Sequence, residues 1–121
     1  MSKRILVVED QEDNRRIMRD LLEASGYELV EATTGEEGLA RAERERPDLI
    51  LMDIQLPGLD GYEVTRRIKA NPALSHIPII AVTSYALSGD DQKAFAAGCD
   101  GYVTKPFSPR QLLAKIREYL K

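Results

Sequence analysis

Leu49-Ile50-Leu51-Met52-Asp53 is a short apolar run that ends in a carboxylate. Polar and apolar residues do not alternate in it, as they would in a strand with one face in water. A continuous apolar run is typical of a parallel strand covered by helices on both sides. We therefore place it in the middle of a parallel sheet. Three further short runs also end at polar side chains: residues 5–8 at Glu9 and Asp10, 79–82 at Thr83, and 101–104 at Lys105.

Short apolar runs alternate with segments of helical period, and the alternation repeats five times. This pattern predicts βα units and an α/β fold. With right-handed crossovers and residues 49–52 in the centre, we expect a doubly wound, flavodoxin-like sheet of five parallel strands in the order 2-1-3-4-5, with helices on both faces. Because the carboxyl ends of parallel strands share one edge, the polar residues after the runs should meet there.

Start signals mark several expected helices. Pairs with capping-box spacing are Thr34 and Glu37, Asp60 and Glu63, and Ser88 and Asp91, while Ser108-Pro109-Arg110-Gln111 adds a proline at the first helical position. The first helix is expected near residues 14–25, before Gly26, and the second should end before Pro47. The first helix should have an apolar face of Ile17, Met18, Leu21 and Leu22 and a polar face of Arg15, Arg16 and Arg19.

The length of 121 residues fits one domain, so we expect residues 1–121 to form a single monomeric unit. The formal charge is −3, and basic side chains are scattered among acidic ones, which argues against contact with nucleic acid. No run approaches the roughly 18 apolar residues that span a bilayer, and the run after Lys3-Arg4 is too short for a signal peptide. We therefore expect a cytoplasmic protein without membrane contact.

The chain has one cysteine and one histidine. A single cysteine excludes an internal disulfide and a cysteine-ligated metal centre, and a single histidine argues against a histidine-built metal cluster or a serine-histidine triad. We expect Cys99 to be a small buried residue and His76 to lie in a loop before Pro78.

Three carboxylates, those of Glu9, Asp10 and Asp53, should meet at the sheet edge. At an effective dielectric constant near 20, each pair about 5 Å apart costs roughly 3 kcal/mol, so a positive charge is needed among them. A few carboxylates with water suit Mg²⁺ better than Ca²⁺, and Lys105 supplies a second, movable charge. A cation and a lysine beside a carboxylate indicate a site that accepts a phosphoryl group, with Asp53 as nucleophile and Thr83 donating its hydroxyl.

The segments around these residues resemble the receiver domains of bacterial two-component response regulators, and the likeness covers essentially the whole chain. It rests on Glu9-Asp10, on Leu51-Met52-Asp53-Ile54-Gln55-Leu56-Pro57-Gly58-Leu59-Asp60-Gly61, on Val82-Thr83-Ser84 and on Tyr102-Val103-Thr104-Lys105-Pro106-Phe107. Within the family, the Asp53 segment and Ser75-His76-Ile77-Pro78 are most similar to single-domain receivers of the DivK type.

The resemblance implies how the acceptor and metal sites are built. Asp53 would take a phosphoryl group from a phosphohistidine of a sensor histidine kinase or histidine phosphotransferase. Mg²⁺, for which Mn²⁺ can substitute, would be bound by the side chains of Asp10 and Asp53 and by the Gln55 backbone carbonyl. Glu9 would act through a metal-bound water.

The resemblance also implies a switch. Lys105, aimed by a cis bond before Pro106, and Thr83 would contact the phosphoryl group, and Tyr102 would swing inward. The surface of the fourth helix, fifth strand and fifth helix would then change and bind a downstream protein, whereas the first helix and the loop after the fifth strand would dock the donor. Residues on or near the changed surface are Ala86, Leu87, Phe107, Arg110 and Lys115.

Together these features predict a stand-alone response regulator of a bacterial phosphorelay, a phosphoacceptor that assists its own phosphorylation and dephosphorylation rather than an enzyme with turnover. With no output domain after the fifth helix, its effect should run through another protein. A relay carrier that passes the phosphoryl group onward remains an alternative. An aspartyl-phosphate phosphatase is less favoured because its nucleophile would follow the first strand in an Asp-x-Asp pattern, and a flavodoxin-like binding module because the anionic loop there repels phosphate.

Overall fold

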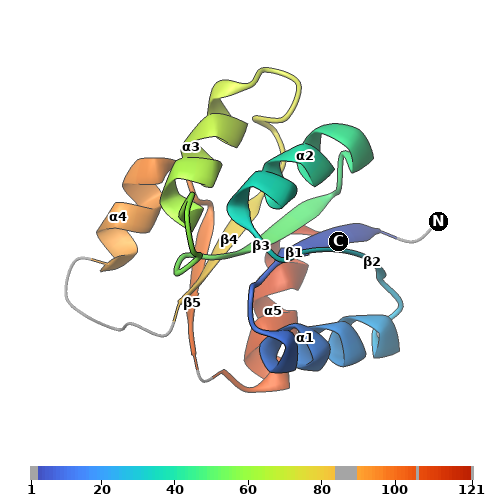
Figure 1. The fold of residues 1–121 in the computed structure, drawn as a ribbon. Coiled ribbons are helices and arrows are strands. Elements are labelled where there is room, and N and C mark those ends of the chain that lie inside the picture. The colour runs from blue at the N-terminus through green and yellow to red at the C-terminus, as the bar shows by residue number, and fades with distance from the viewer. Residues whose placement is uncertain (1–2, 84–89, 106, 121) are drawn as a thin grey trace.

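The computed structural model describes residues 3–83, 90–105 and 107–120, in which strands and helices alternate (Figure 1). The elements are β1 (Arg4–Val8), α1 (Glu12–Ala24), β2 (Glu28–Ala32), α2 (Gly35–Glu45), β3 (Leu49–Asp53), α3 (Gly61–Ala70), β4 (Ile79–Thr83), α4 (Asp90–Ala97), β5 (Gly101–Thr104) and α5 (Pro109–Tyr119). These strands pair in parallel in the order β2-β1-β3-β4-β5. The predicted α/β fold and strand order are confirmed.

Helices cover both faces of the sheet. α1 and α5 lie on one face, and α2, α3 and α4 lie on the other (Figure 1). Successive residues of β1 point to opposite faces, so Ile5 and Val7 join the core under α1 and α5, whereas Leu6 and Val8 join the core under α2, α3 and α4. All five residues of β3 are buried, as expected for a central strand between two helical layers.

The helix start signals are confirmed wherever the structure describes them. The Thr34 and Asp60 side chains each accept a hydrogen bond from the backbone N–H three residues later, at the starts of α2 and α3. Ser108 and Gln111 form a complete capping box around Pro109 at the start of α5. The fourth predicted start, at Ser88, lies outside the described residues.

The first helix differs from the prediction in its buried face. It begins at Glu12, and Met18 and Leu22 are its buried residues. Ile17 was expected beside them but is 58% exposed, so that prediction is wrong. Met18 and Leu22 lie four residues apart on one line along the helix, and Ile17 is turned about 100° away from Met18. The stripe that faces the sheet is therefore narrower than the apolar pattern suggested.

The second helix ends before Pro47, as predicted. Its last residue is Glu45, and Arg46 adopts a left-handed conformation with φ of 46°. At the other end of α2, a side chain at Gly35 would clash with the carbonyl oxygen of Leu59. Because Gly35 has no Cβ, the start of α2 packs directly against the loop between β3 and α3.

The single cysteine and the single histidine lie where they were expected. Cys99 is buried, with its Sγ 3.8 Å from Thr65 Oγ1, and burial raises the pKa of its thiol to about 11. The thiol is therefore protonated at neutral pH. His76 is exposed, between α3 and β4.

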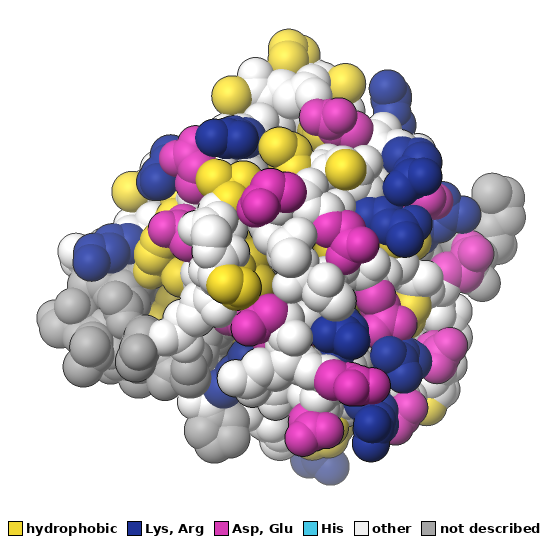
Figure 2. All heavy atoms as spheres, in the orientation of Figure 1, with side chains coloured by type: hydrophobic (Ala, Val, Ile, Leu, Met, Phe, Trp, Pro, Cys, Tyr) yellow, Lys and Arg dark blue, Asp and Glu magenta, His cyan; other side chains and the backbone are white. Residues whose placement is uncertain are grey.

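Charged side chains of both signs are mixed over the surface. On the face drawn in Figure 2, Lys and Arg side chains are interspersed with Asp and Glu side chains. On α3, for example, Glu63 pairs with both Arg66 and Arg67. Exposed pairs of this kind contribute about 0–1 kcal/mol each, so the stability of the fold depends mainly on its two apolar cores. None of the helices in the described ranges has the length and apolar character needed to cross a bilayer.

Candidate functional site

Glu9, Asp10 and Asp53 meet at the carboxyl edge of the sheet. β1 and β3 are paired neighbours, with Val8 opposite Met52, so the residues that follow these two positions lie side by side. One carboxylate oxygen of each acid lies within 4.8 Å of the others. Glu9 is fully buried and Asp53 is 4% exposed, whereas Asp10 is open to solvent. The structure thus brings together the three acids that the sequence placed at this edge.

Lys105 supplies positive charge to these acids. Its Nζ lies 2.6 Å from Glu9 Oε1 and 3.7 Å from Asp53 Oδ2. Its backbone N–H donates to Thr83 O at 2.6 Å, which ties the end of β5 to the end of β4. Thr83 is buried, one residue beyond Val82, which lies opposite Asp53 in the sheet. Lys105 therefore pairs first with Glu9 and only at longer range with the expected acceptor.

The electrostatics of the site centre on Asp53 and Glu9. Burial raises the pKa of Asp53 to about 7, and the hydrogen bond to Glu9 and the charge of Glu9 act in the same direction. The charge of Lys105 and the Gln55 N–H oppose that shift. Burial also tends to raise the pKa of Glu9, but hydrogen bonds with Asp53 and Lys105 and the charge of Lys105 outweigh it, so the pKa of Glu9 is lowered. Below about pH 7 the pair therefore shares one proton, which Asp53 holds.

The oxygen atoms of the site fit a hard divalent cation. Backbone N–H groups orient the two buried carboxylates: that of Gln55 donates to Asp53 Oδ1 at 3.1 Å, and that of Gln11 to Glu9 Oε2 at 3.3 Å. Asp10 adds a third carboxylate that faces solvent. A few carboxylate oxygens with room for water are the ligands that Mg²⁺ prefers. Gln55 itself is exposed, on the loop that follows β3.

A model of the response regulator receiver domain matches residues 5–117. The chain belongs to this family. The receiver domain is 48% identical over 120 residues to the polar-differentiation response regulator DivK of Brucella anthropi, with 99% of this chain and 98% of that protein covered. It is 47% identical over 120 residues to the protein of the same name from Brucella ovis, with the same coverage.

Solved structures of receivers have the same fold. The receiver domain of a sensor histidine kinase from Pseudomonas aeruginosa, solved with a magnesium ion coordinated in the active site cleft, is 38% identical with a TM-score of 0.92, and 98% of each chain is covered. The chemotaxis protein CheY4 of Vibrio cholerae is 29% identical with a TM-score of 0.93, covering 99% of this chain and all of that one. Receiver domains are phosphoacceptor signalling domains of two-component systems, and they typically bind Mg²⁺ at an acidic pocket.

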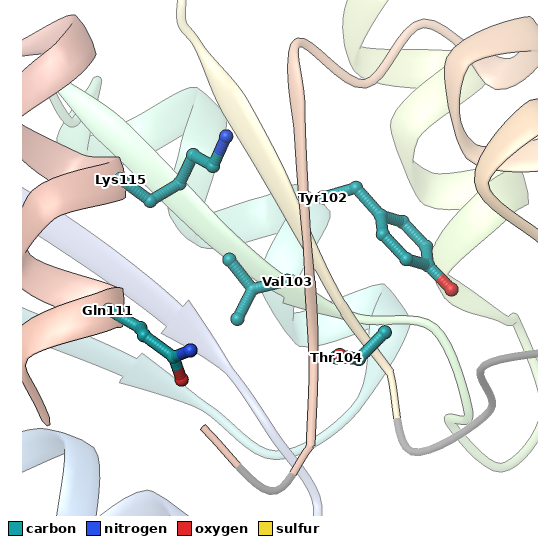
Figure 3. A pocket seen from close by; sticks show the side chains of 5 residues that line it. All are labelled: Tyr102, Val103, Thr104, Gln111 and Lys115. Atoms are coloured by element: carbon teal, nitrogen blue, oxygen red, sulfur yellow. The ribbon is translucent and has the colours of Figure 1, made fainter. Parts of the chain in front are cut away.

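The receiver domain also has a pocket between β5 and α5. Its volume is about 210 Å³, and its lining residues are Tyr102, Val103, Thr104, Gln111 and Lys115 (Figure 3). Gln111 and Lys115 extend from α5 toward the strand, whereas the Tyr102 ring lies on the other side of β5, against the core under α2, α3 and α4. Of the other residues expected at this surface, Phe107 and Arg110 lie near the start of α5, and Ala86 and Leu87 lie outside the described residues, as does Pro106.

Arg15 is a residue of this receiver site that sequence reasoning missed. Its Nη1 donates to the backbone oxygen of Glu9 at 3.0 Å, and its Nε lies 3.3 Å from Glu31 Oε1 on β2. The helical period assigned Arg15 to the polar face of α1, yet its side chain is only 14% exposed. No spacing in the sequence links Arg15 to Glu31, because their contact depends on how α1 packs against β2.

Proposed function

We propose that residues 1–121 form one receiver domain that accepts a phosphoryl group on Asp53 from a phosphohistidine of a histidine kinase or phosphotransferase. The observation that carries this proposal is the buried Asp53 carboxylate at the end of β3, beside two further acids and Lys105. One Asp53 oxygen would attack phosphorus, the bond from phosphorus to the donor imidazole nitrogen would break, and the imidazole would leave with a proton. Because burial raises the pKa of Asp53 to about 7, this carboxyl must first lose its proton.

The residues around Asp53 have separate roles in this proposal. Mg²⁺, or Mn²⁺ in its place, would be held by the side chains of Asp10 and Asp53 and the Gln55 backbone carbonyl, with Glu9 acting through a water. The cation supplies positive charge for the phosphoryl oxygens when it is bound. Lys105 offers a second positive partner, since its Nζ is already 3.7 Å from Asp53 Oδ2.

The output of the domain follows from the added charge. A phosphoryl group brings close to two negative charges and three acceptor oxygens, which draw Lys105 and the Thr83 hydroxyl inward. Tyr102 then moves toward the space that the Thr83 side chain leaves. Converting an active population of about 1% into the dominant one needs a bias of several kcal/mol, which charge-assisted hydrogen bonds can supply. The changed surface of α4, β5 and α5 binds a downstream protein in the cytosol.

The proposal is tested by incubating the purified chain with a small phosphodonor and Mg²⁺ and measuring its intact mass. The wild-type chain should gain the mass of one phosphoryl group, and Asp53→Asn should gain none. Asp60→Asn is a matched control in the same loop, because asparagine also caps a helix well, and it should react like the wild type. Uptake that persists in Asp53→Asn would identify another acceptor and overturn the proposal.

The same chemistry serves a relay carrier or a phosphatase, and the fate of the phosphoryl group separates them from a switch. A carrier passes the group to a second histidine phosphotransferase, which a mixing experiment with labelled protein detects. A phosphatase turns over small phosphate esters many times, whereas the receiver proposed here takes up one equivalent. Sustained turnover would contradict the receiver assignment of Asp53.

A further inference from the structure

We propose that Arg15 is a positioning residue for the Mg²⁺ site, holding the backbone of Glu9 so that the Glu9 carboxylate points into the pocket. This inference rests on the proposed function, since it concerns the same metal site. Arg15 lies on α1, and the contacts described above join it to Glu9 and Glu31 and not to the Asp53 carboxylate.

Glu9 is anchored through its backbone as well as its carboxylate. Its N–H donates to Ala32 O at 3.0 Å, which extends the pairing of β1 with β2 by one residue. Its carbonyl oxygen accepts from Arg15 Nη1, also at 3.0 Å. Together these two bonds fix the peptide groups on both sides of the Glu9 Cα. The Arg15 contact therefore helps to set the direction of the Glu9 side chain, whose carboxylate also contacts Lys105 and the Gln11 N–H.

Arg15 is itself held in place from β2. Its Nε faces Glu31 Oε1 at 3.3 Å, and Glu31 is clamped by Arg19 through Nε to Oε2 at 2.9 Å and Nη2 to Oε1 at 2.8 Å. A guanidinium is a rigid planar fork, so Arg15 can serve Glu31 with one nitrogen and Glu9 with another at fixed relative positions. The edge strand β2 is thereby linked to the acidic pocket through one side chain.

A positioning role and a purely electrostatic role predict opposite effects on metal affinity. A cation near a metal site repels Mg²⁺, so removing the Arg15 charge would raise the affinity if charge were all that mattered. If Arg15 positions Glu9, its removal should lower the affinity, as the loss of groups that orient metal ligands typically does, by roughly tenfold. The sign of the change therefore separates the two roles.

The test is calorimetric titration of the metal-free, full-length chain with Mg²⁺ at pH 8. Arg15→Met should weaken Mg²⁺ binding roughly tenfold. Arg15→Lys should also weaken it, because an ammonium group cannot reach both acceptors at fixed geometry. The matched control is Arg16→Met, which removes the same charge from the neighbouring position, where the side chain is 58% exposed and 3.9 Å from Glu12; its affinity should equal or slightly exceed that of the wild type.

Each outcome bears on the inference. Unchanged or tighter Mg²⁺ binding by a folded Arg15→Met would overturn it, and so would wild-type affinity in Arg15→Lys, which also serves as the test if Arg15→Met does not fold. A circular dichroism melt of each variant establishes folding. If the wild-type chain binds Mg²⁺ and takes up a phosphoryl group, and both Arg15 variants bind Mg²⁺ equally well, only this inference is refuted. A wild-type chain that binds no Mg²⁺ would refute the metal site in the proposed function as well.

Discussion

Replacing Asp53 by Asn should stabilise the metal-free protein at neutral pH. In the folded chain, burial raises the pKa of Asp53 from 3.8 to about 7, and the hydrogen bond and charge of Glu9 contribute to this rise. The folded state therefore holds a proton that the unfolded chain has already released, and stability falls as pH rises between these two values. Asparagine cannot ionise, so the variant escapes this loss, and its amide can donate to Glu9 in place of the shared proton.

The size of the effect follows from the same shift. A raise of roughly three pKa units corresponds to about 4 kcal/mol at 1.36 kcal/mol per unit, reached when pH exceeds the folded-state pKa. Below pH 4 both states carry the proton and the difference vanishes. Asp53→Asn should thus gain up to about 4 kcal/mol over the wild type at pH 8 and progressively less at pH 6 and pH 5.

Urea unfolding followed by circular dichroism in EDTA, at pH 5, 6, 7 and 8, measures this difference. Asp20→Asn is the matched control, because it makes the same substitution at an exposed position of α1, and its difference from the wild type should be small at every pH. Added Mg²⁺ should stabilise the wild type by mass action and Asp53→Asn much less. A gain that does not change with pH, or a variant less stable than the wild type at pH 8, would refute the shared-proton account.

Three further predictions concern the metal and the helix ends. Mg²⁺ affinity should fall about tenfold per pH unit below pH 7, because the cation must displace the Asp53 proton; calorimetry that finds a constant affinity from pH 5 to 8 would contradict this. Arg46→Gly should raise stability by about 1 kcal/mol, since glycine adopts the left-handed conformation without strain, and an unchanged or lower unfolding midpoint would refute it. Ser108→Ala should cost about 1 kcal/mol through the lost capping box, whereas Ser108→Asp should retain most of that stability.

The fold could be predicted because its main signals are local. The unbroken apolar run ending at Asp53 identified a strand buried on both faces, and the structure buries all of β3. Serine, threonine and aspartate caps act on backbone N–H groups three residues away, so their geometry is contained in a few consecutive residues. Strand ends then converge because parallel strands share one carboxyl edge, which is why residues as distant as Glu9 and Lys105 could be placed together before the structure was known.

What could not be predicted depends on packing between elements. Ile17 is apolar and neighbours Met18, so the sequence did not indicate that α1 buries a narrower stripe and leaves this side chain exposed. The assignment of Arg15 to the polar face of the first helix did not reveal its burial, because its partner Glu31 comes from β2 and helix period alone does not say which strand a helix crosses. The closer approach of Lys105 to Glu9 than to Asp53 is likewise a matter of distances between three side chains, which no spacing along the chain encodes.

These contacts bear on how the pocket would respond to a cation or a phosphoryl group under the proposed function. Lys105 lies nearest Glu9, and burial together with Glu9 raises the pKa of Asp53 to about 7, so below that pH Asp53 holds a proton. In the proposed function, a divalent cation would displace that proton, and a phosphoryl group on Asp53 would offer Lys105 a more highly charged partner than Glu9. Both events would change the charge that faces Lys105. The charge-assisted hydrogen bonds that the phosphoryl group would form with Lys105 are therefore the source of the free energy proposed to shift this side chain, and with it the end of β5.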